Sequence, residues 1–65
     1  MLHFGKLVKE RRELLNLTQR DLAEMSGITE RTIYKIEKGI GAVTLPTMEK
    51  LCEIVGLEII IQLKR

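Results

Sequence analysis

Apolar residues recur at helical spacing over most of the chain, and the spacing becomes strand-like only near its end. Within residues 3–15 one helical face collects Phe4, Leu7, Val8 and Leu15. Within residues 44–55 a second stripe collects Leu45, Met48, Leu51, Cys52 and Val55. The pattern predicts a first and a fourth helix that flank a central region of shorter helices.

The central region, residues 18–38, contains two short helical patterns separated by a glycine turn. Thr18 precedes Asp21 by three positions, which is a variant of the capping box that starts helices. Gly27 tolerates the left-handed conformation that ends many helices. Thr29 then supplies a second N-cap after a very short connection. This spacing is typical of a helix-turn-helix.

The second of these helices separates apolar from long polar side chains. Ile33, Ile36 and Glu37 fall on one stripe, which we expect to face inward. The remaining, outward positions are Glu30, Arg31, Tyr34, Lys35 and Lys38. Side chains of this kind on an exposed helix reach base edges in a DNA major groove.

Two charged residues lie on faces that are otherwise apolar. Arg12 shares a face with Val8 and Leu15, and Glu37 lies on the inner stripe of its helix. A buried charge is costly unless it is paired. We therefore expect an ion pair between Arg12 and Glu37; the alternative is that each side chain extends separately to water.

Residues 57–63 alternate in the manner of a β-strand, with β-branched residues at the centre. One side would carry Leu57, Ile59, Ile61 and Leu63, and the other Glu58, Ile60 and Gln62. The rest of the chain offers no second strand, so the expected partner is a second copy that pairs antiparallel about a two-fold axis. The alternative is a fifth helix.

The segment LTQRDLAEMSGITERTIYKIEKG resembles the helix-turn-helix of the Cro and lambda-repressor type, also called the xenobiotic-response-element family. The flanks KERRELLNLTQ and LPTMEKLCEIVGLEIII make HipB-like antitoxins the closest resemblance. The resemblance implies a mostly α fold, a four-helix lambda-repressor-like domain whose C-terminal strands pair across a homodimer. It also implies the pairing of Arg12 with Glu37.

The resemblance implies a sequence-specific repressor that binds a palindromic operator in double-stranded DNA. It also implies the antitoxin of a HipA-like kinase toxin, which represses its own toxin-antitoxin operon. Arg31 and Lys35 are the candidate readers of guanine, and Glu30 of cytosine, with Thr32 beside them. The candidate phosphate contacts are Gln19, Thr29, Tyr34 and Lys38. Three of these candidate DNA contacts have structural alternatives. Gln19 and Tyr34 could be plain surface residues, and Glu30 could only stabilise the helix dipole.

Composition narrows the remaining classes of function. The chain has 65 residues and a net charge of +2, which fits one domain, residues 1–65, with only a mild basic bias. A chain this short buries only about 60% of its unfolded surface, so dimerisation would add needed stability. Acidic and basic residues balance within residues 18–38, which keeps open a protein-interaction module without DNA binding. A stand-alone repressor without a toxin is the other alternative.

The chemistry-bearing residues are few. The single cysteine, Cys52, lies on an apolar stripe and is read as a core residue, and the single histidine, His3, lies near the terminus. No cluster has metal-ligand spacing and no glycine-rich phosphate loop occurs, so we expect no enzyme activity, metal or cofactor. With no signal peptide or apolar span, the expected location is the cytoplasm and not a membrane.

Overall fold

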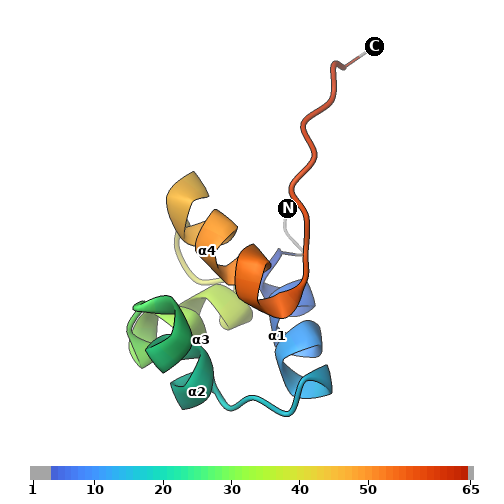
Figure 1. Cartoon of the computed structure of the whole chain (residues 1–65). Helices are drawn as coiled ribbons and strands as arrows, with labels where there is room; N and C mark the ends of the chain where they lie inside the picture. Colours follow the sequence, from blue (N-terminus) through green and yellow to red (C-terminus); the bar gives the residue numbers. More distant parts are fainter. Residues whose placement is uncertain (1–3, 65) are drawn as a thin grey trace.

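Four helices form the body of the computed structural model, which describes residues 4–64 (Figure 1). They are α1 (Phe4–Leu14), α2 (Gln19–Ser26), α3 (Glu30–Lys38) and α4 (Leu45–Val55). The expected mostly helical, four-helix fold is therefore confirmed, with α1 one residue shorter at its C-terminal end than the pattern indicated; His3 lies outside the described residues. None of the described helices is long and apolar enough to cross a membrane.

The ends of the two central helices follow from local chemistry. Thr18 and Asp21 form a reciprocal capping box, in which each backbone N–H donates to the other side chain at 2.9 Å. Gly27 ends α2 with a φ of 75°, in the left-handed region where a side chain would be strained. Thr29 caps α3 by accepting from the backbone N–H of Thr32 at 3.2 Å. The predicted turn is thereby confirmed at both of its ends.

Acid should weaken the start of α2. Hydrogen bonds from the backbone and side chain of Thr18 lower the pKa of Asp21. A carboxyl group with a lowered pKa contributes stability above its ordinary pKa and loses that contribution as the pH falls through the lowered value. The capping box is therefore complete at neutral pH.

The core is aliphatic and draws on all four helices. Val8, Leu22, Ile33, Ile36, Leu51 and Val55 are buried together. Partly buried side chains pack around them, namely Phe4, Ala23, Ile28, Val43, Ile54 and Leu57. Cys52 is only 6% exposed, and burial raises the pKa of its thiol, as expected of a core residue.

The buried face of α1 differs from the prediction. Leu7 and Leu15 are 45% and 41% exposed, whereas Gly5, Val8 and Arg12 are buried. The cause is a close approach of α1 to α3: a Cβ on Gly5 would lie in hard contact with the carbonyl oxygen of Ile36. The side of α1 that packs against α3 is therefore the side that carries Gly5, and Leu7 is left facing solvent.

The fourth helix also departs from the predicted stripe at its first residue. Leu45 is 48% exposed and Met48 is partly buried, while the later stripe positions lie in the core. The end of the helix is fastened to α1, because Arg11 Nε donates to the carbonyl oxygen of Val55 at 2.8 Å. Packing therefore tightens toward the C-terminal end of α4.

The segment after α4 does not form the expected strand. Residues 57–64 carry no regular secondary structure and leave the helices as an extended tail (Figure 1). Ile61 and Leu63 are 85% and 97% exposed, although Leu57 reaches the core. A strand needs a neighbouring row of backbone partners, and no strand occurs elsewhere in residues 4–64. The strand is thus absent from the single chain, and so is the alternative fifth helix.

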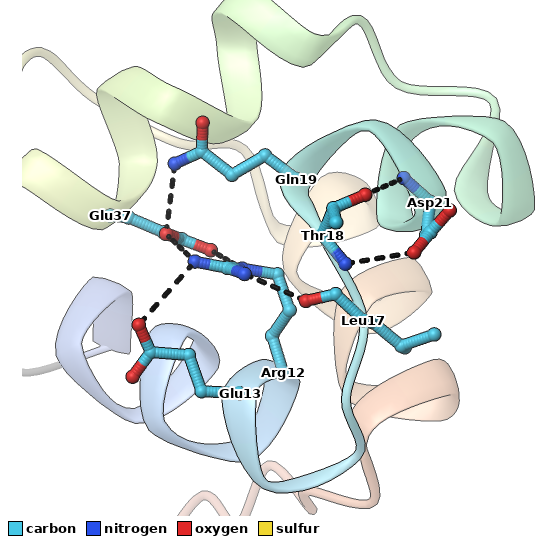
Figure 2. Close-up of polar contacts among 7 residues, drawn as sticks. All are labelled: Arg12, Glu13, Leu17, Thr18, Gln19, Asp21 and Glu37. Carbon is cyan, nitrogen blue, oxygen red and sulfur yellow. Dashed lines mark hydrogen bonds and ion pairs between the residues drawn. The ribbon is translucent and has the colours of Figure 1, made fainter.

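Arg12 and Glu37 join α1 to α3 through two hydrogen bonds (Figure 2). Arg12 Nε donates to Glu37 Oε2 at 2.7 Å, and Nη2 donates to Oε1 at 3.0 Å. Arg12 Nη1 donates to the carbonyl oxygen of Leu17 at 2.7 Å. The side chains of Arg12 and Glu37 are 9% and 3% exposed, so both charges are buried together. Among the described residues no buried side-chain nitrogen or oxygen lacks a partner.

Replacing Arg12 with alanine should destabilise the fold by about 3–5 kcal/mol, because Glu37 would remain as a buried, uncompensated charge. Equilibrium denaturation measures this loss. The double variant Arg12→Met with Glu37→Leu should recover much of it, since no charge is then left buried. The matched control is Arg20→Ala, which removes an exposed partner 3.8 Å from Glu24 and should cost at most about 1 kcal/mol. A loss no larger than the control would place the Arg12 charge in water.

Replacing Gly5 with alanine should lower the melting temperature, although alanine favours a helix by about 1 kcal/mol over glycine. The new methyl group would meet the Ile36 carbonyl and force α1 away from α3, at a cost of about 1–3 kcal/mol. Thermal melts beside an exposed control on the same helix, Glu10→Ala, decide the matter. A rise in melting temperature would contradict the close packing.

Candidate nucleic-acid interface

The helix-turn-helix holds α3 against the body of the domain by its apolar side. Ile33 and Ile36 are buried, and Leu22 of α2 is buried against them. The opposite side of α3 is exposed along its whole length and carries Glu30, Arg31, Thr32, Tyr34, Lys35 and Lys38. All five outward positions expected from the sequence are therefore exposed, and Thr32 is exposed beside them.

At the start of α3, two hydroxyl groups are already engaged. Thr29 accepts from the backbone N–H of Thr32, and their two hydroxyl oxygens lie 2.8 Å apart. Glu30 and Arg31 follow in the first turn with exposed side chains. The side chain of Thr29 thus serves first as a helix cap, and the long side chains beside it remain free to reach outward.

Side chains of α2 and α3 meet around an open hollow of about 520 Å³. Its lining residues are Gln19, Glu30, Arg31 and Tyr34. The fold thus brings the first residue of α2 beside the first turns of α3, whereas Lys35 lies outside this hollow. One shallow surface therefore combines an amide, a carboxylate, a guanidinium and a phenol.

Gln19 is held from below by Glu37, a contact that the sequence did not indicate. Gln19 Nε2 donates to Glu37 Oε1 at 3.0 Å, and the same oxygen accepts from Arg12 (Figure 2). A carboxylate can only accept, so the amide nitrogen must face it and the amide oxygen points away. One N–H of Gln19 remains available for another acceptor. The buried ion pair therefore orients a surface side chain.

A second hollow, of about 210 Å³, adjoins the first. It is lined by Lys9, Gln19, Tyr34, Glu37 and Lys38. Lys38 Nζ lies 5.8 Å from the centre of the Tyr34 ring, within the range of a cation–π contact. Lys9 is an addition to the residues expected at this surface, because it lies on α1 and outside the helix-turn-helix of residues 18–38.

The cationic side chains of α3 on this surface form no ion pair within residues 4–64. Within residues 4–64, ion pairs join Arg12 to Glu13 and Glu37, and Arg20 to Glu24. None of these involves Arg31, Lys35 or Lys38. The same described residues hold no cluster of His, Cys, Asp and Glu side chains suited to a metal ion. The surface therefore presents positively charged hydrogen-bond donors beside the exposed carboxylate of Glu30.

Sequence comparisons with known proteins agree with a helix-turn-helix in this chain. The family model described as Helix-turn-helix matches residues 8–61. An uncharacterized HTH-type transcriptional regulator of Methanothermobacter thermautotrophicus is 39% identical over 52 residues, which are 80% of this chain and 75% of that protein. A putative HTH-type transcriptional regulatory protein of the same organism is 38% identical over 55 residues, or 85% of this chain.

Most of the matched relatives are much longer than this chain. The matched segment is 18% of the second Methanothermobacter protein, and 16% of a putative HTH-type transcriptional regulatory protein of Archaeoglobus fulgidus that is 43% identical over 49 residues. It is 30% of the HTH-type transcriptional regulator PuuR of Escherichia coli, which is 36% identical over 55 residues. The family match covers α2, α3, α4 and most of α1, and the chain belongs to the helix-turn-helix family of the Cro and lambda-repressor type.

Proposed function

We propose that the protein is a sequence-specific transcriptional repressor that inserts α3 into the major groove of double-stranded DNA. The supporting observation is the two-sided character of α3: its apolar side is buried, and its outer side presents cations that no ion pair within residues 4–64 occupies. Donors and acceptors on an exposed helix match the pattern that base pairs display in this groove.

Each outer side chain is assigned a role by its position. Arg31 and Lys35 lie one turn apart and donate to the O6 and N7 atoms of guanine. Glu30 accepts from a cytosine amino group; as an alternative, it only stabilises the positive end of the α3 dipole. Tyr34 and Lys38 contact phosphates on one flank of the helix.

The start of each motif helix contacts the DNA backbone in this proposal. Gln19 donates its remaining N–H to a phosphate, and the first backbone N–H groups of α2 face the same strand. Thr29 acts at the corresponding end of α3, and Thr32 keeps the Thr29 hydroxyl in place. These contacts set the register of α3 in the groove without reading sequence.

The proposed active species is a homodimer joined by the tails of its two copies. Ile60, Ile61 and Leu63 are exposed in the single chain, and an extended segment without a partner leaves its backbone groups unpaired. Residues 57–63 of two copies, with their alternation of Leu57, Ile59, Ile61 and Leu63, would pair antiparallel. This pairing would cover exposed side chains and supply partners for backbone groups. Two α3 helices must then lie about 34 Å apart to read successive major grooves of a palindrome.

The finer proposal is that the repressor is a HipB-like antitoxin, whose partner is a HipA-like kinase and whose target is its own operon. Its support is the resemblance of both flanks of the motif to HipB-like proteins. A stand-alone repressor is the alternative with the same DNA chemistry. A kinase-like neighbouring gene whose product copurifies with this chain supports the antitoxin, and the lack of such a neighbour favours the stand-alone role.

The balanced charge of residues 18–38 favours one further candidate, a protein-interaction module that does not bind DNA. Selection from random duplexes at low salt separates the two classes. Enrichment of a palindrome supports the repressor, and the absence of any enriched sequence supports the module.

Substitution of the base-reading residues should relax specificity. We expect Arg31→Ala or Lys35→Ala to weaken binding to the selected palindrome by about 1–3 kcal/mol while changing binding to random DNA less. Gln19→Ala should weaken both duplexes to a similar extent, because a phosphate contact carries no sequence information. Fluorescence titrations of both duplexes give the comparison. Equal losses on both duplexes for Arg31→Ala would refute its assignment to bases.

Removal of the exposed part of the tail should yield a monomer. A chain that stops after Ile59 keeps Leu57 in the core, so its helices should melt as a folded unit while the dimer is lost. A full-length Ile61→Lys variant tests the same interface without shortening the chain. Sedimentation equilibrium gives the mass of each variant, and titrations give its affinity for the palindrome. Dimers of undiminished affinity in both variants would move the interface onto the helices.

A further inference from the structure

The second hollow lies where α1 meets the helix-turn-helix, and only Lys9 among its five lining residues comes from outside residues 18–38. Lys9 of α1 and Lys38 of α3 contribute its cations, and Gln19 and Tyr34 are shared with the first hollow. Three helices therefore converge on one depression. A contact made here would continue the proposed backbone contacts of α2 and α3 toward the first helix.

The balance of charge in this hollow is positive. Its only carboxylate, Glu37, is 3% exposed and is bound by Arg12 through two hydrogen bonds. Lys9 and Lys38 are exposed, and neither takes part in an ion pair within residues 4–64. The negative charge on the hollow's wall is thus already compensated, whereas its two ammonium groups are not.

The polar groups around the hollow are suited to a phosphate oxygen. The contact with the Tyr34 ring keeps Lys38 near the depression, and Glu37 fixes the amide of Gln19 with one N–H left to donate. Each lysine adds an ammonium group with three donors. The surrounding groups therefore supply several donors and an uncompensated positive charge at one place.

We infer that Lys9 binds a phosphodiester of the DNA backbone, in a phosphate-binding site that it forms with Lys38, Gln19 and Tyr34. This inference rests on the proposed function, since the phosphate belongs to the strand that borders the groove occupied by α3. It adds the first helix to the DNA-binding surface. Lys9 contributes affinity and orientation, and it reads no base.

The salt dependence of DNA binding tests this role directly. Each phosphate neutralised by a lysine adds about 0.9 to the slope of log affinity against log salt concentration. For a mixed-sequence duplex, Lys9→Ala should reduce the slope by about 0.9 for each bound protomer. Its affinity deficit relative to the unmodified chain should then shrink by about 3.5-fold per protomer between about 50 and 200 mM salt.

Three controls separate this role from a general effect of charge or folding. Lys50→Ala removes an equal charge from an exposed position on α4 and should leave the slope unchanged. Lys9→Arg keeps a cation at the site and should also retain the slope. Thermal melts of Lys9→Ala should match those of the unmodified chain, because the side chain is exposed.

The outcomes for the inference and for the proposed function are distinct. If the unmodified chain binds duplexes with a steep salt dependence and Lys9→Ala keeps the full slope, the phosphate-binding site at Lys9 is refuted. DNA binding itself then stands. If Lys50→Ala lowers the slope as much as Lys9→Ala does, the effect is one of net charge, and the phosphate-binding site at Lys9 is again refuted. If the unmodified chain binds no duplex at low salt, the proposed function itself fails.

Discussion

The Arg12–Glu37 ion pair is the interaction on which the geometry of the surface depends. It fastens α1 to α3, and Arg12 also holds the Leu17 carbonyl in the connection that leads into α2. The same carboxylate then accepts from Gln19, so one buried anion on α3 binds side chains of both α1 and α2. Apolar replacements can fill such a site and keep the domain stable. They cannot orient an amide, so the pair contributes geometry that packing alone does not supply.

The parts of the fold that the sequence predicts well are those determined by neighbouring residues. The boundaries of α2 and α3 depend on caps within a few positions, and Thr18, Gly27 and Thr29 are readable for that reason. The buried face of α1 depends on what another helix brings against it. Periodicity favours Leu7, but the backbone of Ile36 comes so close that only glycine fits at position 5. No pattern within α1 contains that information.

The same distinction applies to the candidate interface. The outward face of α3 follows from helical spacing, because a helix with one apolar stripe must expose the other side. The link from Gln19 to Glu37 joins residues 18 positions apart, and the hollow that includes Lys9 joins still more distant ones. These depend on how three helices cross. The tail is the opposite case: its alternation is clear in the sequence, but a ladder also needs a partner that a single chain does not contain.

The point at which the core is complete has a consequence for how such domains combine with others. Leu57 is the last residue that packs against the buried cluster, and all six buried members of that cluster come before it. Among the described residues, 58–64 add no side chain to this cluster. A unit of this kind can be joined to unrelated segments during evolution without being refolded around them. The matched stretch accordingly fills most of one relative and less than a fifth of others.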